Sequence, residues 1–346
     1  MATGYARRVA VLLASHPVYL EHVAGVGHPE RPDRLTAVAQ GVRDAGLVDA
    51  VVPFEPRAAT IDELALVHPV AYVEALDRFC TAGGGQLDPD TGVVPRSFDA
   101  ALRAVGAGVE AVERLDRGEG DAAFCAVRPP GHHATPTRGM GFCLFNSVAV
   151  TAATLAARGE RVLVFDYDAH HGNGTQDAFY ADPRVLFVSF HQYPLYPGTG
   201  ALRDTGVDAG VGTTVNLPLP AGTTGDVYRS AFDRVVRPVV DRFAPTWVLL
   251  SAGFDAHRAD PLTDLALTAG DFADLTAEVL SLVPPGRRVV FLEGGYDLVA
   301  VARSTAACLA AMTGTVLRPE APSSGGPGVD VVDAAVRLHL GDGAGS

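Results

Sequence analysis

The chain has 346 residues, of which 48% are hydrophobic, so it is long and apolar enough to bury a large core. Its formal net charge is −13, which argues against a nucleic-acid partner because such a partner requires a basic face. No apolar run reaches the roughly 18 residues needed to cross a bilayer, and the cysteines form no C-x-x-C pair, so we expect no membrane partner, no disulfides and a cytoplasmic location.

Short apolar runs alternate with helical patterns along the chain. We expect strands at residues 9–14, 122–127, 161–166, 185–189, 246–251 and 288–292, and helices at residues 100–115, 147–158, 227–243 and 269–282. This alternation is typical of an α/β fold, in which helices cover both faces of a mostly parallel sheet. We further expect a loop at residues 83–96, a linker at 315–328 and a short terminal helix at 329–340, peripheral to any chemistry.

Polar side chains follow four of these strands. His132 and His133 come after residues 122–127, and the sequence DYDAHHGNG begins at the end of residues 161–166. Asp255 and Tyr296 follow the last two predicted strands. Because ligands bind at the carboxyl ends of the strands in an open parallel sheet, we expect these side chains to meet at one edge.

The sequence after residues 161–166 suggests a metal site. In an extended chain Asp166, Asp168 and His170 share a face, and His171 points away. Asp168, His170 and Asp255 from another strand could bind one divalent ion and leave a position open, as a catalytic zinc requires. A set with two carboxylates could also admit iron(II). The alternative is a polar strand end that holds no metal.

The adjacent His132 and His133 suit general acid–base catalysis. Asp166 could orient one imidazole and Asn173 the other. Because an amide does not stabilise an imidazolium as a carboxylate does, we expect the two histidines to differ in pKa. Tyr296 follows two glycines, which let a backbone pack closely beside a ligand, and its phenol could stabilise an oxyanion.

Seven motifs carry a resemblance to the histone deacetylase family. They are HPERPDRL (28–35), RPPGHHA (128–134), GFCLFN (141–146), DYDAHHGNGTQ (166–176), PGTG (197–200), SAGFDAHRADPL (251–262) and EGGYD (293–297). They occur in family order across about residues 10–312. Asn173, where class I enzymes carry Asp, and Glu293, where they carry Gly, resemble the class II branch and its bacterial histone deacetylase-like and acetylpolyamine amidohydrolase relatives.

The resemblance implies an arginase/deacetylase-like three-layer α/β fold with a central, mostly parallel eight-stranded sheet. It implies one catalytic domain at residues 1–316, followed by a peripheral tail at 317–346. The implied zinc ligands are Asp168, His170 and Asp255. The implied catalytic residues are His132 paired with Asp166, His133 paired with Asn173, and Tyr296, which would polarise the substrate carbonyl.

Further sites are implied by the resemblance alone. One structural potassium ion would be held by Asp166, Asp168, His170, Ser189 and Phe190, and a second by Phe179, Asp182 and Val185. Residues of the substrate channel would be Phe142, Tyr196, Leu262, Gly141, Asp90 at the rim and Arg34 near the product-release cavity. The implied activity is zinc-dependent hydrolysis of a linear amide.

The substrate is left open between acyl-lysine side chains and acetylpolyamines or other small acetyl-amines. Leu262 stands where polyamine-selective relatives can carry an acid, and residues 83–96 are short for a capping loop, so we favour acyl-lysine. A second hypothesis is an arginase-like hydrolase with two metal ions, but such a site would need more Asp and His ligands than the one Asp-x-His and one Asp seen here. A non-catalytic acyl-lysine binding protein would be expected to lack one of the catalytic residues. The sequence leaves the oligomeric state open.

Overall fold

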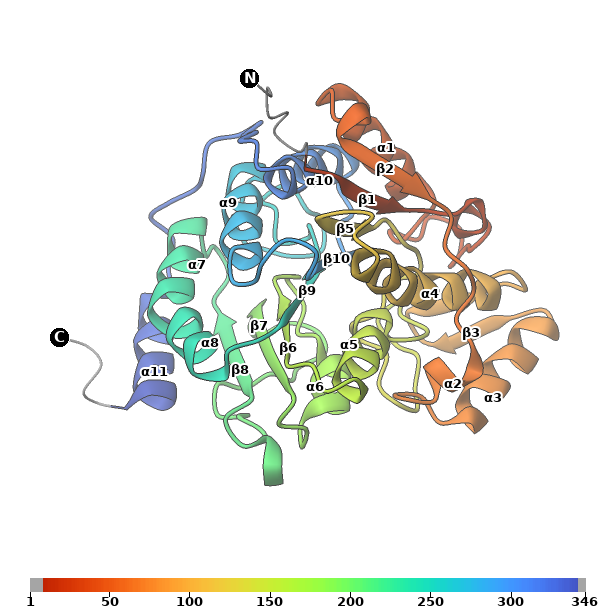
Figure 1. Cartoon of the computed structure of the whole chain (residues 1–346), viewed down its shortest axis with the longest axis horizontal. Helices are drawn as coiled ribbons and strands as arrows, with labels where there is room; N and C mark the ends of the chain where they lie inside the picture. Colours follow the sequence, from red (N-terminus) through yellow and green to blue (C-terminus); the bar gives the residue numbers. More distant parts are fainter. Residues whose placement is uncertain (1–8, 342–346) are drawn as a thin grey trace, which may run out of the picture.

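Eight strands form the central sheet of the computed structural model, which describes residues 9–341 (Figure 1). The strand order is β2-β1-β5-β10-β9-β6-β7-β8, and every neighbouring pair is parallel. The strands are β1 (Val11–Ala14), β2 (Val51–Phe54), β3 (Gly85–Asp88), β4 (Thr91–Val93), β5 (Ala122–Cys125), β6 (Val162–Asp166), β7 (Val185–Gln192), β8 (Thr214–Leu219), β9 (Trp247–Ala252) and β10 (Arg288–Leu292). The predicted eight-stranded parallel sheet is confirmed.

Helices cover both faces of this sheet. They are α1 (Asp33–Asp44), α2 (Ile61–Leu64), α3 (Val70–Thr81), α4 (Ser97–Asp116), α5 (Ser147–Ala157), α6 (Asn173–Phe179), α7 (Gly225–Ala231), α8 (Arg237–Phe243), α9 (Ala269–Leu280), α10 (Leu298–Met312) and α11 (Val329–Leu340). In Figure 1, α1, α10, α9, α7 and α8 lie along one face, and α4 and α5 lie along the other. The three-layer architecture is therefore the predicted one.

The two edge strands, β2 and β8, are absent from the strands predicted by hydrophobic pattern. Each contains a proline, Pro53 in β2 and Pro218 in β8. Proline cannot donate a hydrogen bond to a neighbouring strand, so it is tolerated at the edge of a sheet and argues against a strand when a sequence is read alone.

Two predicted segments differ in detail. The helix expected at residues 227–243 is α7 and α8 joined by a π-helical turn, Phe232–Val236, in which the Arg237 N–H donates to the Phe232 carbonyl. Pro238, which has no N–H, follows this turn. The segment 83–96 was expected to be a loop, but it contains the antiparallel hairpin β3–β4.

The tail after α10 has the predicted order of linker and helix. Residues 315–328 contain no helix or strand, and α11 packs against β8 and α7. The boundary at residue 316 between the catalytic domain and the tail remains a prediction. Residues 1–8 of the predicted domain and residues 342–346 of the predicted tail lie outside the described residues. Within the part of the chain that is described, no helix is long and apolar enough to span a membrane.

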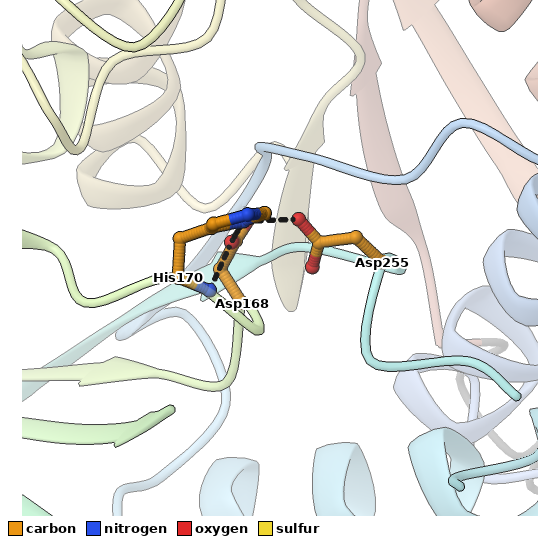
Figure 2. Close-up of side chains that lie close together, drawn as sticks. All are labelled: Asp168, His170 and Asp255. Carbon is orange, nitrogen blue, oxygen red and sulfur yellow. Dashed lines mark hydrogen bonds and ion pairs between the residues drawn. The ribbon is translucent and has the colours of Figure 1, made fainter. Parts of the chain in front are cut away.

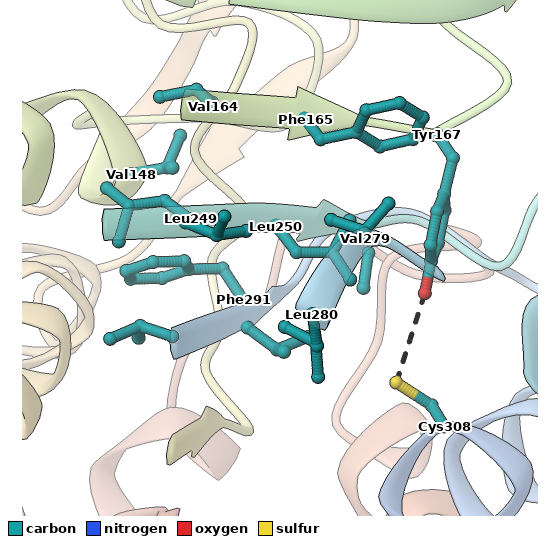
Figure 3. Close-up of a cluster of buried hydrophobic side chains, with 14 of the residues drawn as sticks. Val148, Val164, Phe165, Tyr167, Leu249, Leu250, Val279, Leu280, Phe291 and Cys308 are labelled. Carbon is teal, nitrogen blue, oxygen red and sulfur yellow. Dashed lines mark hydrogen bonds between the residues drawn. The ribbon is translucent and has the colours of Figure 1, made fainter. Parts of the chain in front are cut away.

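The core is continuous across the middle strands. Every residue of β5, β6, β7 and β9 is buried, as expected for a parallel sheet covered on both faces. Figure 3 shows Phe165, Leu250 and Phe291 from three neighbouring strands packed among side chains of the flanking helices. All four cysteines are free and buried, and Cys308 lies 3.9 Å from the Tyr167 hydroxyl. This rigid centre fixes the positions of the strand ends.

A buried histidine away from the strand ends makes the stability of the fold sensitive to acid. His68 donates from Nδ1 to the Pro136 carbonyl (3.1 Å) and accepts at Nε2 from the Asn146 N–H (2.9 Å), so it is a neutral tautomer. Burial lowers its pKa to about 4. Because the unfolded chain takes up the proton first, stability is present above about pH 6.5 and is lost as the pH falls towards 4, by up to roughly 3 kcal/mol.

We therefore expect His68→Gln to be less stable than the parent chain at pH 7.5 but to lose less stability between pH 7.5 and pH 5. Urea unfolding at both pH values measures the difference. A residual pH dependence is expected in the variant, because burial also lowers the pKa of His22 to about 4. Equal losses in the variant and the parent would contradict this account of His68.

Candidate active site

The predicted polar residues meet where four adjacent strands end. β5, β10, β9 and β6 are neighbours in the sheet, and their carboxyl ends lead into the loops that carry His132, Tyr296, Asp255 and Asp168. This follows from the parallel register, in which Asp166 pairs with Ser251 and Ser251 pairs with Phe291. The expectation that the side chains share one edge is confirmed.

Asp168, His170 and Asp255 form a group that could hold a metal ion (Figure 2). One ligand atom from each lies within 4.8 Å of the other two. His170 Nδ1 is 2.9 Å from Asp255 Oδ2 and 3.2 Å from Asp168 Oδ1. Among the described residues this is the one group of three or more His, Cys, Asp or Glu side chains with such spacing.

The charges of this group fit a cation. Both carboxyl groups are fully buried, and burying two like charges together is costly unless a positive charge compensates them. Burial and the charge of Asp168 raise the pKa of Asp255 to about 7. Burial disfavours the imidazolium of His170, but hydrogen bonds to Asp168 and Asp255 raise its pKa to about 10. The raised pKa of His170 and the burial of two carboxylates beside it both show that this group favours a positive charge, which a divalent ion would supply.

The backbone holds these carboxylates in position. The Ala169 N–H donates to Asp255 Oδ1 (2.8 Å), and the Gly294 N–H donates to Asp168 Oδ2 (2.8 Å). A Cβ atom at Gly294 would lie 2.3 Å from Asp255 Oδ2. Glycine at this position is therefore required by the close approach of the chain to the two carboxylates.

The two adjacent histidines have the predicted partners. His132 Nδ1 donates to Asp166 Oδ2 (2.9 Å), and His133 Nδ1 donates to Asn173 Oδ1 (2.8 Å). Each imidazole therefore has its Nε2 atom left for chemistry. Burial opposes a charge on His132, but Asp168 and Asp166 raise its pKa well above the usual value. Burial and the neighbouring charge of His132 lower the pKa of His133 well below it. The expected difference between the two histidines is present.

A cavity of about 260 Å³ leads to this group. The predicted channel residues Phe142, Tyr196, Leu262, Gly141 and Asp90 line it, together with Pro130, His132, His133, His170, Leu195, Gly294 and Tyr296. The Tyr196 ring stands edge-on to His133 at 5.2 Å, and the Phe142 ring stands edge-on to Tyr296 at 5.8 Å. The walls are thus aromatic and suited to an apolar stem.

Tyr296 is fixed from two sides. Its N–H donates to Asp260 Oδ2 (2.7 Å), and the guanidinium of Arg34 lies 5.2 Å from the centre of its ring. Burial raises the pKa of the Tyr296 phenol well above its usual value, so the hydroxyl keeps its proton at neutral pH. It is therefore available as a hydrogen-bond donor.

Arg34 does not line the cavity but lies buried behind it. Its Nε donates to the Gly295 carbonyl (2.7 Å), and its guanidinium also reaches the Glu293 carbonyl. Glu30 accepts from Arg34 (3.1 Å) and from Arg128 (2.6 Å). Burial opposes the charge of Glu30, but Arg128 and Arg34 lower its pKa to about 2. Glu30 and Arg128 lie in the motifs HPERPDRL and RPPGHHA, but their pairing could not be predicted from the sequence.

Asp90 lines the cavity, and one oxygen of its carboxylate is engaged by neighbouring donors. Asp90 Oδ1 accepts from the Gly141 N–H (3.2 Å) and from the Thr91 hydroxyl (2.7 Å). Its neighbour Asp88 pairs with Arg138 (2.5 Å). Asp88 and Asp90 therefore both hold the loop at residues 138–142, and Asp90 also lines the cavity.

The residues of the first predicted potassium site lie at the end of β6, just after it, and within β7. Asp166 is paired with Ser189 across the two strands, and Phe190 follows, while Asp168 and His170 leave β6. The Ser189 hydroxyl lies 3.0 Å from His191 Nδ1.

The residues of the second predicted potassium site, Phe179, Asp182 and Val185, form the turn between α6 and β7. The Asp182 carboxylate pairs with Arg184 (2.6 Å). A cation in this turn would therefore be held by backbone carbonyls.

Glu293 has a structural role that the sequence analysis did not give it. Its buried Oε2 accepts from the N–H groups of Gly131 (2.7 Å) and His132 (3.2 Å), in the loop that carries the two histidines. Burial raises its pKa to about 7. No pattern in the sequence marks this contact, because it joins residues 162 positions apart in the chain.

We expect Glu293→Ala to lower kcat by about tenfold to a hundredfold, because two buried N–H groups lose their acceptor and the histidine loop is freed. Glu293→Gln is the matched control, since its amide oxygen can still accept both bonds, and we expect a smaller effect. Steady-state kinetics of both variants make the comparison. Equal losses in the two variants would show that the carboxylate charge matters and the anchoring does not.

Comparison with known proteins gives the family. The histone deacetylase domain matches residues 28–312 of the chain. The chain belongs to the histone deacetylase family. It is 41% identical over 306 residues to a probable deacetylase of Archaeoglobus fulgidus, with 86% of this chain and 85% of that protein covered. It is 38% identical over 311 residues to histone deacetylase 10, chloroplastic, of Oryza sativa subsp. japonica, with 83% and 70% covered.

The fold agrees with that of the family. A crystal structure of the HDA15 HD domain matches with a TM-score of 0.89 and 35% identity, covering 97% of this chain and 95% of that one. The arginase/deacetylase-like architecture is therefore confirmed. Membership in the histone deacetylase family supports a deacetylase-type amidohydrolase, and the buried Asp-His-Asp group fits the metal cofactor that the family suggests.

Proposed function

We propose that the protein is a zinc-dependent amidohydrolase that removes acetyl or other short acyl groups from lysine side chains. The observation that carries the proposal is the convergence of Asp168, His170 and Asp255 with the two histidines and Tyr296 at one cavity. An acyl-lysine binding protein without activity would have no use for a polarised histidine pair facing a protonated phenol, so catalysis is favoured over binding alone.

Zinc would be held by Asp168, His170 and Asp255. When bound, such an ion supplies Lewis-acid polarisation of the amide carbonyl and activation of a water nucleophile. Two carboxylates and one imidazole also suit iron(II), so the metal found in the cell is part of the proposal to be tested. Potassium at the first predicted site would join the end of β6 to the middle of β7, and potassium at the second would join the end of α6 to the start of β7.

The residues of the chain divide the proton transfers between them. His133 is neutral, and its Nε2 lone pair takes a proton from the attacking water. The Tyr296 hydroxyl donates to the carbonyl oxygen as negative charge develops there. His132, whose pKa is raised by Asp168 and Asp166 against the cost of burial, stabilises the same charge in its cationic form. The proton held by His133 then passes to the departing amine, and the C–N bond breaks to give a carboxylate and a free amine.

The opening of the cavity favours an acyl-lysine side chain over an acetylpolyamine. A polyamine carries a second ammonium group, which would need an unengaged carboxylate near the opening. Leu262, which is 38% exposed at the opening, offers none. Both oxygens of Asp260 accept, from the Leu262 and Tyr296 N–H groups. Asp90 accepts from the Gly141 N–H and the Thr91 hydroxyl through Oδ1, so its Oδ2 is the carboxylate oxygen of the lining that a second ammonium group could meet. The acetylpolyamine alternative is retained as the second candidate, because the net charge of −13 attracts cations in general.

The test compares the zinc-loaded protein on an acetyl-lysine peptide, N-acetylputrescine and N8-acetylspermidine, with Tyr296→Phe as the control. All 27 basic residues are arginine, so the protein itself adds no acyl-lysine to the assay. We expect the highest kcat/KM on the peptide and a collapse of turnover in the variant. Higher kcat/KM on the acetylpolyamines than on the peptide would show that the substrate is a small acetyl-amine, which is the second candidate. Turnover of none of the three would count against the deacylase itself.

A further inference from the structure

The segment between α10 and α11, residues 317–328, is tied closely to the body of the fold. In Figure 1 it runs along the outside of the molecule past α9 and α7. The Ser323 N–H and hydroxyl donate to the buried carboxylate of Asp271 in α9, at 3.0 and 2.7 Å. The Gly326 N–H donates to the Thr224 hydroxyl next to α7 (2.8 Å). The segment is therefore held in one position by both helices.

One side chain of this segment reaches towards the active site. Glu320 Oε2 lies 2.7 Å from His257 Nε2 and accepts more weakly from the Ala269 N–H (3.3 Å). Its other oxygen, Oε1, lies 2.7 Å from Arg258 Nη2. Glu320 is 12% exposed and His257 only 4%, whereas Arg258 is 57% exposed. The bond to His257 is consequently the contact that is shielded from water.

The hydrogen bonds of His257 fix which nitrogen carries the hydrogen. The Ala259 N–H donates to His257 Nδ1 (3.1 Å), so this atom has the lone pair and Nε2 has the hydrogen that is donated to Glu320. The backbone of His257 accepts from the Asp260 N–H (2.8 Å). His257 therefore joins the outer segment to the loop that follows β9.

That loop carries two groups of the active site. Asp255, two residues before His257, is one of the three candidate metal ligands. Asp260, three residues after it, accepts from the N–H of Tyr296 (2.7 Å). A shift of His257 would displace both the metal ligand and the support of the catalytic phenol.

We propose that residues 317–328 act as a brace for the metal site, with Glu320 as a positioning residue that holds the Asp255–Asp260 loop through His257. The inference rests on the proposed metal-dependent function. It gives the tail a part in the chemistry, although the sequence predicted a peripheral linker. Glu320 touches neither substrate nor metal and acts only through the loop.

The test measures zinc affinity by competition with a chromophoric chelator, together with kcat, KM and Tm, on the full chain. We expect Glu320→Ala to bind zinc about tenfold to a hundredfold more weakly and to lose kcat, with KM little changed. Glu320→Gln keeps an oxygen that can accept from His257 and gives up only the exposed Arg258 contact, so we expect it to restore zinc affinity to near that of the parent.

Arg318→Ala is the matched control in the same segment. Arg318 pairs with Asp274 of α9 (2.6 Å) and has no contact with the metal loop, so its loss should leave zinc affinity and kcat unchanged. If Glu320→Ala does not fold, Glu320→Asp, one methylene shorter, serves instead, with weaker zinc binding expected.

Three results would overturn the brace. The first is parent-like zinc affinity and kcat in Glu320→Ala, or in Glu320→Asp where that variant replaces it, which would leave the proposed function standing. The second is an equal loss in Arg318→Ala, which would reduce the segment to a stabilising element. The third is a parent chain that binds no zinc and hydrolyses no acetyl-amide, and this result would reject the proposed function as well.

Discussion

Replacing Asp255 by alanine is expected to abolish amide hydrolysis through loss of the metal. Asp255 is one of the three candidate metal ligands, and two protein ligands are too few to hold an ion at a site where one coordination position is already left open. A metal of this kind contributes several kcal/mol of transition-state stabilisation. Its loss therefore costs about a thousandfold or more in kcat.

Asp255→Asn separates the loss of metal from a loss of folding. Burial and the charge of Asp168 raise the pKa of Asp255, so the ionised carboxylate opposes folding in the metal-free chain at pH 8. Asparagine keeps the shape and an acceptor for the Ala169 N–H. We expect the metal-free asparagine variant to be at least as stable as the metal-free parent, and to be inactive when zinc is added.

The parent chain and Asp255→Asn are compared by three measurements: metal content by elemental analysis, Tm with and without zinc, and turnover. Zinc should raise the Tm of the parent and leave that of the variant unchanged, because a ligand stabilises only the state that binds it. Chelation should inactivate the parent, and added zinc should restore it. A variant that keeps both one zinc per chain and its activity would remove Asp255 from the metal site.

The sequence predicted the centre of this fold better than its edges. The middle strands are apolar throughout because helices cover both faces, so short apolar runs marked them clearly. The edge strands β2 and β8 each contain a proline, and pattern alone did not mark them as strands. Their presence was expected only from the resemblance to the histone deacetylase family.

The same contrast holds for the site. Residues that follow strand ends, such as Asp168 and His132, could be placed together because the topology of a parallel sheet brings those ends to one edge. Contacts between distant segments left no such pattern. Glu293 beneath the histidine loop and Glu320 beside His257 depend on packing between loops, which neither periodicity nor spacing encodes.

The second large effect is expected for His133→Ala. Its Nδ1–H is donated to Asn173, and its lowered pKa keeps it neutral, so it is the histidine of the pair that can accept a proton from water. Removing a general base of this kind typically lowers the rate about a hundredfold to ten-thousandfold. His133 is not among the three candidate metal ligands, so zinc content should not change.

Asn173→Ala is the companion variant, because it leaves the imidazole in place but removes the partner that orients it. We expect a smaller loss in kcat, about tenfold to a hundredfold, with KM and zinc content like those of the parent. Steady-state kinetics with metal analysis on both variants test the assignment. If His133→Ala kept most of its kcat while His132→Ala lost it, the roles of the two histidines would be the reverse of those proposed. The different partners of the pair, an amide for one and a carboxylate for the other, would then need another explanation.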